Sequence, residues 1–195
     1  MRTKKVVVLP YDRTWEFAFE QIKREIEGTI GDLVIGIEHV GSTSVEGMSA
    51  KPIIDIDVII QDYAVFDAVV RRLEAIGYVH EGNLGIKDRE AFKYSNKPHL
   101  RQHHLYVCPQ QSEELHRHIT FRDFLANNPE AVKKYSAGKE KAAQLFPDNI
   151  DVNFAPRATL ARTFRHALTG KQPHCHGGQP HPGNSSIMIS AHIIV

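Results

Sequence analysis

The sequence predicts an α/β (α+β) fold with a helical C-terminal half. Three observations point to this class. An apolar stripe at helical spacing opens the chain, short apolar runs of strand length follow between residues 33 and 108, and helical patterns take over after residue 111. Such an order, with strands in the middle and helices on either side, is typical of a sheet covered by helices.

The first half of the chain alternates helices with strands. A helix is predicted from Asp12, and Gly31 can end it. A strand is expected at 33–40, a second at 53–60, and an amphipathic helix at about 63–76. The apolar stripe of the first helix consists of Trp15, Phe19, Ile22, Ile26 and Ile30.

The second half adds short strands and then helices. Asn128 and Pro129 indicate a helix start, because proline is favoured at the first helical position. Residues 4–9 could form an edge strand or an extended arm. The strands are expected at 78–80, 91–94 and 103–108, and the helices at about 112–126, 129–145 and 157–168.

The 195 residues are enough for one domain with an appended segment. We expect the domain at 1–170 and a tail at 171–195. The tail has no acidic residue, three prolines and four histidines, so it is predicted to be disordered or not native to the protein. His174, Cys175 and His176 could bind a soft metal, but no second ligand pair at zinc-site spacing accompanies them.

Composition argues against some classes of function. The net charge is +1, whereas a protein dedicated to long nucleic acid would carry a strong basic excess. No stretch approaches the roughly 18 apolar residues of a membrane span, and the apolar run after the N-terminus is too short for a signal peptide. The two cysteines, Cys108 and Cys175, are far apart and fit a reducing compartment. A cytoplasmic protein without a membrane partner is expected.

Two aspartates stand inside the apolar run at 53–60. Residues two apart in a strand point to the same face, so Asp55 and Asp57 project together, opposite their isoleucine neighbours. With roughly 5–6 Å between the charges and an effective dielectric of about 20, their repulsion costs about 3 kcal/mol. A fold tolerates this if a cation lies between them or if one aspartate is protonated.

The turn upstream of this strand is suited to phosphate. Gly41 permits close backbone approach, and Ser42 and Thr43 begin a short helical turn whose N–H groups attract anions. A phosphate-binding turn with paired carboxylates is what a nucleoside triphosphate carrying Mg²⁺ (or Mn²⁺) requires. Structural alternatives remain open: the aspartates could cap neighbouring loops, and the hydroxyls could be helix N-caps.

These residues resemble known families. Gly-Ser, a spacer and Asp-apolar-Asp are similar to the signature of the nucleotidyltransferase superfamily, the polymerase β-like fold. More narrowly, HVGSTSVEGMSAKPIIDIDV at 39–58, HHLYV at 103–107 and RHITFRDFLANNPE at 117–130 resemble the GrpB (UPF0157) family. The resemblance runs from about Tyr11 to Phe146. It implies a nucleotidyltransferase-like mixed β-sheet flanked by helices and a transferase activity of unsettled substrate, and some relatives are fused to dephospho-CoA kinase.

The motif and the resemblance together name the candidate site residues. Where the family usually has a second histidine, this chain has Tyr106. For phosphate or nucleotide binding the candidates are Gly41, Ser42, Thr43, Lys51 and His39. For catalysis they are Asp55, Asp57 and His104, of which the two aspartates are also the expected ligands of Mg²⁺ or Mn²⁺.

A third carboxylate is common in active nucleotidyltransferases on a neighbouring strand. Glu81, Glu90 and Asp123 are candidates, and His104 could hold that place instead. A missing third acid favours weak catalysis or a binding role. His104 alternates with His103 along its strand, so only one of the two can face the pocket.

Several other polar residues have simpler interpretations. Lys51 is either a phosphate contact or a solvated loop residue. An ion pair that fixes helix to sheet is the simpler interpretation of Arg122 and Asp123. Arg89 and Lys93 could reach a triphosphate, but a solvated face is the simpler interpretation. His116 and His118 lie two apart on a helix and cannot share one face.

The leading hypothesis is a metal-dependent enzyme that transfers a nucleotidyl group from a nucleoside triphosphate to an unknown acceptor. One alternative is a non-catalytic nucleotide- or coenzyme-binding module that assists a partner enzyme. Another is a histidine-assisted phosphohydrolase that uses His104 and His39. The sequence leaves the oligomeric state, the acceptor and the preferred base open.

Overall fold

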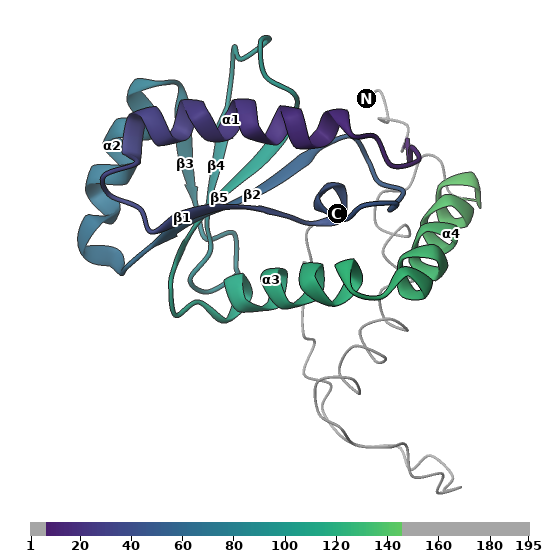
Figure 1. Ribbon diagram of the computed structural model, residues 1–195. Helices are drawn as coiled ribbons and strands as arrows, with labels where there is room; N and C mark the ends of the chain where they lie inside the picture. The colour runs from purple at the N-terminus through teal and green to yellow at the C-terminus, as the bar shows by residue number, and fades with distance from the viewer. Residues whose placement is uncertain (1–6, 146–195) are drawn as a thin grey trace, which may run out of the picture.

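A computed structural model describes residues 7–145 of the chain. Within them a five-stranded sheet lies between helical layers (Figure 1), with α1 and α2 on one face and α3 on the other. The predicted helix at 157–168, the tail at 171–195 and its His-Cys-His cluster lie outside the described residues, as does the domain boundary at 170.

The sheet is mixed. Its strand order is β1-β2-β5-β4-β3, with β2 and β5 parallel and the other pairs antiparallel. The strands are β1 (Gly36–Val40), β2 (Ile54–Ile60), β3 (Tyr78–Gly82), β4 (Glu90–Tyr94) and β5 (His103–Pro109). The helices are α1 (Thr14–Ile30), α2 (Phe66–Ala75), α3 (Glu113–Ala126) and α4 (Pro129–Leu145), with short 3₁₀ turns η1 (Ser42–Ser44) and η2 (Tyr63–Val65). The predicted α/β (α+β) class, a mixed sheet flanked by helices, is confirmed.

The main core lies between the sheet and the α1–α2 layer. All five members of the predicted stripe on α1 are buried, and they pack with Ile54, Ile56 and Val58, the alternate residues of β2. Each fully buried residue of this size stabilises the fold by about 2 kcal/mol. The opposite face of β2 is therefore free to carry polar side chains without exposing the core.

Several boundaries differ from the pattern-based expectation because turns take residues from element ends. The strand expected from residue 33 begins at Gly36, since the Leu33 amide donates to Ile30 and closes a turn after α1. The helix expected from residue 63 opens with a 3₁₀ turn, where Asp62 accepts a hydrogen bond from the Ala64 amide. In the described part of the arm expected at 4–9, Leu9 forms an isolated bridge with Ala50.

A second, smaller apolar cluster joins the loop after β1 to the last two helices. Its buried members are Val45, Met48, Leu125, Val132 and Tyr135. This cluster fixes η1 against α3 and α4, and so places residues from the end of the described chain beside the Gly-Ser turn. None of the helices in residues 7–145 has the length and apolarity needed to cross a membrane.

Candidate active site

The two aspartates project from the face of β2 opposite the main core. Both are fully buried. They share one face of the sheet, as the alternation of side chains along a strand predicts. In the parallel register with β5, Asp55 lies beside His104 and Asp57 lies beside Tyr106. These four residues form the centre of the candidate site.

Asp55 and His104 form a hydrogen-bonded pair. His104 Nδ1 lies 2.8 Å from Asp55 Oδ1, and its Nε2 has no hydrogen-bond partner among the described residues. Burial raises the pKa of Asp55. Burial acts against the imidazolium of His104, but the hydrogen bond and charge of Asp55 outweigh it and raise the pKa of His104. The charge of Lys51 opposes that rise, which places this predicted residue within electrostatic reach of the site.

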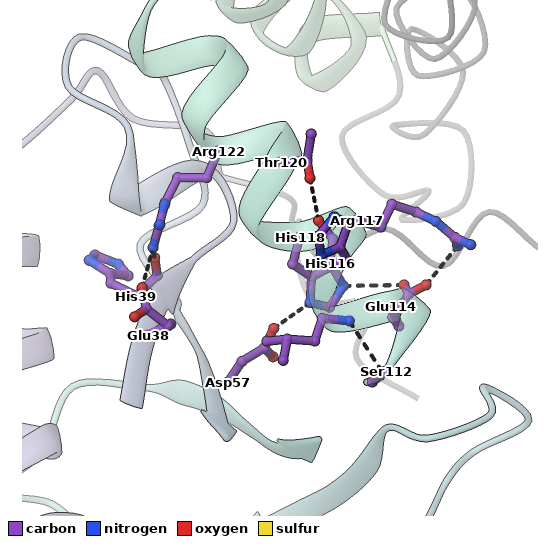
Figure 2. Close-up of polar contacts among 11 residues, drawn as sticks. Glu38, His39, Asp57, Ser112, Glu114, His116, Arg117, His118, Thr120 and Arg122 are labelled. Atoms are coloured by element: carbon purple, nitrogen blue, oxygen red, sulfur yellow. Dashed lines mark hydrogen bonds and ion pairs between the residues drawn. The ribbon is translucent and has the colours of Figure 1, made fainter. Parts of the chain in front are cut away.

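Asp57 is held by a histidine from α3 (Figure 2). His118 Nδ1 lies 2.6 Å from Asp57 Oδ2, and His118 Nε2 lies 3.2 Å from Glu114 Oε1. Burial disfavours the charged ring, but the two carboxylates prevail and raise the pKa of His118 to about 9. The ring is therefore an imidazolium at neutral pH. Arg117 donates to the other carboxylate oxygen of Glu114 at 2.6 Å.

The two histidines account for how the fold tolerates adjacent aspartates. Each carboxylate has its own histidine partner, His104 for Asp55 and His118 for Asp57. Yet each also keeps one oxygen, Asp55 Oδ2 and Asp57 Oδ1, that is buried without a hydrogen-bond partner in residues 7–145. A buried carboxylate oxygen without a partner is costly, and such oxygens mark a place where a ligand can bind.

Those two oxygens are donors of the kind that a magnesium ion uses. Carboxylate oxygen is the donor that Mg²⁺ prefers, and one or two carboxylates with phosphate oxygens and waters are its usual protein site. Across the described part of the chain, no group of three or more histidine, cysteine, aspartate or glutamate side chains is placed to hold a metal. Asp55 and Asp57 could therefore supply two ligands, and the remainder must come from water or phosphate.

The Gly-Ser turn lies directly against Asp55. Gly41 has a φ of +73°, and a Cβ atom at this position would lie 2.4 Å from Asp55 Oδ2, so only glycine fits. Ser42 follows in η1, and its hydroxyl accepts a hydrogen bond from the ammonium of Lys139 on α4. Lys139 also donates to the Ser49 carbonyl at 3.2 Å and is buried. A positive charge thus lies at the turn predicted to bind phosphate.

His39 is not brought together with the aspartates. In the β1–β2 register it lies opposite Ile56, on the face of the main core, and its ring stacks on Phe19 at 4.7 Å. Burial lowers the pKa of His39 to about 4, so the ring is neutral. Thr43 donates its hydroxyl to the Ile53 carbonyl and accepts from His39 Nε2 at 3.0 Å. The structure gives His39 the role of fixing Thr43 in the turn.

The three carboxylates considered as a third acid are each held by another partner, and Glu81 also lines a cavity together with His104 and Tyr106. Glu90 bonds to His80 at 2.7 Å on the core face, and Glu81 pairs with Lys93 at 3.1 Å. Asp123 pairs with Arg122 on α3. The place beside Asp55 on β5 belongs to His104, the alternative that the sequence offered.

Arg122 fixes α3 to the first strand, as its sequence context indicated. Its guanidinium donates to Glu38 Oε2 at 2.6 Å and to the His39 carbonyl at 3.0 Å (Figure 2). These contacts hold the helix that carries His118 over the aspartates. Arg122 is therefore a positioning residue for the site.

Comparison with known proteins assigns the family. The family model described as GrpB protein matches residues 5–160. The chain belongs to the GrpB family. UPF0157 protein YqkA of Bacillus subtilis is 34% identical over 149 residues, which are 76% of this chain and 43% of that protein. Glutamate-rich protein GrpB of Alkalihalophilus pseudofirmus is 33% identical over 150 residues, 74% of this chain and 85% of that protein. The match therefore spans less than half of the first relative.

A solved structure agrees with the family assignment. GrpB from Enterococcus faecalis superposes with a TM-score of 0.73 at 31% identity, over 84% of this chain and 98% of that one. Cid1 poly(U) polymerase gives a TM-score of 0.49 at 8% identity, over 68% of this chain and 42% of that one, a likeness that says nothing about activity. More distantly, a dephospho-CoA kinase of Mycolicibacterium paratuberculosis is 25% identical over 77% of this chain and 42% of that protein.

Four residues around the centre of this GrpB-family site were not among the predicted site residues, although Arg89 and His118 had been considered. A signal existed for two of them, because Glu114 and His118 are four apart on a predicted helix and share the face of Leu115. Lys139 carries no local signal, since its burial depends on the distant Gly-Ser turn. Arg89, expected on a solvated face, is only 5% exposed. That interpretation is corrected, because its guanidinium stacks on Tyr106 instead of reaching water.

Proposed function

We propose that this protein is a metal-dependent nucleotidyltransferase that moves a nucleotidyl group from a nucleoside triphosphate to an acceptor. The observation that carries the proposal is the pair of buried carboxylates, Asp55 and Asp57, each with one oxygen lacking a partner. Their position beside Gly41 and the buried ammonium of Lys139 adds a place for phosphate. Carboxylates and a phosphate-binding turn together favour phosphoryl chemistry over binding of an uncharged ligand.

Each side chain has a role in this proposal. The Gly41–Ser42 turn and Lys139 bind the phosphate chain, while His104 and His118 orient Asp55 and Asp57 through one oxygen each. Mg²⁺ or Mn²⁺, held by the free aspartate oxygens, would supply neutralisation of the phosphate charge when bound.

The reaction forms a bond between an acceptor oxygen and the α-phosphorus and breaks the bond from that phosphorus to the bridging oxygen, so pyrophosphate leaves. His104 Nε2, which has no partner among the described residues, accepts the proton that the acceptor hydroxyl gives up. For that transfer the imidazole must be neutral. Because the pKa of His104 is raised, its neutral base form becomes abundant only at a higher pH than that of an ordinary histidine.

Calorimetric titration tests the proposal. ATP, GTP, CTP and UTP are titrated with and without Mg²⁺ into the wild type, Asp55→Asn and the control Asp67→Asn, an exposed aspartate on α2. We expect one nucleotide to bind with metal to the wild type and to the control, and to lose at least tenfold in affinity in Asp55→Asn. Equal metal-dependent binding in Asp55→Asn would remove the premise that Asp55 holds the metal.

The same titration separates the non-catalytic alternative. Tight nucleotide binding without pyrophosphate release, with acceptors supplied, favours a module that assists a partner enzyme. The relative named dephospho-CoA kinase supports that direction.

A second candidate function rests on the Asp55–His104 pair. A histidine whose Nδ1 is held by a carboxylate and whose Nε2 is open is the arrangement of a general base. A histidine-assisted phosphohydrolase would keep its activity after chelation of metal and lose it in His104→Ala. Activity that disappears with chelator argues for the transferase instead.

A further inference from the structure

Arg89 is a buried cation without a counter-ion among residues 7–145. It directly precedes β4, is 5% exposed, and its Nε has no hydrogen-bond partner. Other arginines of the described chain hold carboxylates: Arg72 pairs with Asp32, Arg117 with Glu114 and Arg122 with Glu38. The guanidinium of Arg89 instead lies over the ring of Tyr106, with 4.4 Å between its central carbon and the ring centroid.

A cation in this position is costly unless an anion joins it. Removing a guanidinium from water is expensive, and stacking on an aromatic ring recovers only part of that cost. Buried arginines are therefore normally paired with carboxylate or phosphate, to which they present a planar set of donors. No ion pair joins Arg89 to a carboxylate of residues 7–145, although the buried Glu114 carboxyl, which is paired with His118, also lies within reach of its charge.

The sheet places this cation on the far side of the aspartates from the Gly-Ser turn. Gly41 follows β1, the aspartates are on β2, Tyr106 is on β5, and Arg89 adjoins β4. With strands about 4.8 Å apart, β4 lies roughly 10 Å from β2, away from β1. The guanidinium itself lies over Tyr106 on β5, so an anion held there is one strand from the aspartates and two strands from β1, which Gly41 follows.

Arg89 acts on the face that carries the catalytic candidates. The pKa values of His104 and Tyr106 are both raised overall, and the positive charge of Arg89 opposes each rise. A cavity of about 530 Å³ adjoins this face, and its lining includes His104, Tyr106, Lys93 and Glu81. Arg89 is not part of that lining, but its guanidinium stacks on the Tyr106 ring, which is. That volume suits a small molecule. Burial raises the pKa of Tyr106 to about 12, so its hydroxyl keeps its proton and can donate to an anion.

We propose that Arg89 and Tyr106 form an anion subsite that binds the phosphate or carboxylate of the acceptor, which is then a small acidic molecule. The assignment to the acceptor rests on the proposed transferase function. The acid group lies on Arg89, and the reacting hydroxyl of the same molecule lies toward His104. The other possible source of the anion, the phosphate chain of the nucleotide, is distinguished by experiment.

The direct test uses inorganic phosphate and acetate as probes, without nucleotide or metal. NMR follows the ring resonances of Tyr106 during titration of the wild type, Arg89→Gln and the control Arg71→Gln, an exposed arginine on α2. We expect saturable shifts in the wild type and the control, and at least tenfold weaker binding in Arg89→Gln. Unchanged binding of both probes in Arg89→Gln, or no shift in the wild type, overturns the subsite.

Two further measurements separate this proposal from its alternatives. Thermal unfolding of Arg89→Met should give a melting temperature close to that of the wild type, because residues 7–145 form no ion pair with the buried wild-type guanidinium. A large fall would make Arg89 a structural residue and overturn the proposal. Mg²⁺–nucleotide affinity should be unchanged in Arg89→Gln, and its loss would assign the anion to the nucleotide. If no nucleotide binds the wild type while phosphate still shifts Tyr106, the transferase function fails and the anion subsite stands.

Discussion

Replacement of His118 by leucine should lower the free energy of unfolding, because the buried Asp57 carboxylate then loses its cationic partner. The pKa of His118 is raised from 6.5 to about 9 by that carboxylate and by Glu114. At about 1.4 kcal/mol per pKa unit, this corresponds to about 3 kcal/mol of stabilisation at neutral pH. That figure agrees with the roughly 3–5 kcal/mol that removal of one partner from a buried ion pair usually costs.

Urea unfolding at pH 7 with chelator present measures the effect. We expect His118→Leu to lose about 3 kcal/mol of unfolding free energy, and the double variant Asp57→Asn/His118→Leu to recover at least half of it, because no buried charge is then left unpaired. A loss under about 1 kcal/mol in the single variant, or no recovery in the double variant, would refute the ion-pair account.

The same pair predicts a direction of pH dependence. A pKa raised in the folded state gives stabilisation that is complete below the unfolded value of 6.5 and lost as pH rises through about 9. The wild type should therefore lose about 3 kcal/mol between pH 6 and 10 relative to the double variant, in which neither group titrates. A difference that does not change with pH would contradict the charged state of His118.

Three further variants test the turn and its supports. Gly41→Ala should cost at least about 2 kcal/mol of unfolding free energy and abolish nucleotide binding, because its methyl group would collide with Asp55 Oδ2 at a positive φ. The control Gly28→Ala has open space on α1 and should stabilise the protein by about 0.5–1 kcal/mol. Lys139→Met should weaken nucleotide binding at least tenfold in calorimetry and lower the melting temperature, because the Ser49 carbonyl loses its donor. Equal affinity would remove Lys139 from the phosphate site. Arg122→Lys should slow turnover without changing nucleotide affinity, because α3 loses its fork-shaped link to Glu38; loss of affinity instead would place Arg122 in the binding site.

The fold and the centre of the site could be predicted because their signals are local. Period-two alternation places Asp55 and Asp57 on one face, and the same rule separates His103 from His104. His103 packs beneath Tyr94 with 4.2 Å between ring centroids, and burial lowers its pKa to about 4, while His104 meets Asp55. Strand periodicity predicted that only one of the two adjacent histidines could face the aspartates, and the structure places His104 there.

The outer parts of the site could not be predicted because their burial depends on distant segments. Glu114 and His118 give α3 a charged face, which in an isolated helix indicates exposure to water. Only the packing of that face on the aspartates makes it buried. Lys139 likewise lies 97 residues from Ser42 in sequence, and no spacing rule connects them. Arg89 was misjudged for the same reason, since its burial follows from the path of the neighbouring strand.

The two helical layers are attached to the sheet by different forces. α1 and α2 share a continuous apolar core with one face, whereas α3 contacts the other through charged groups, and α4 bonds to η1 and joins one small apolar cluster. Less apolar surface is exposed when the second layer opens, so amide hydrogens of α3 and α4 should exchange faster than those of α1 and β2. Such an opening also uncovers the buried aspartates. Entry of a ligand at the candidate site and partial unfolding would then be one motion, and we expect the less stable of the two layers to be the one that covers the aspartates.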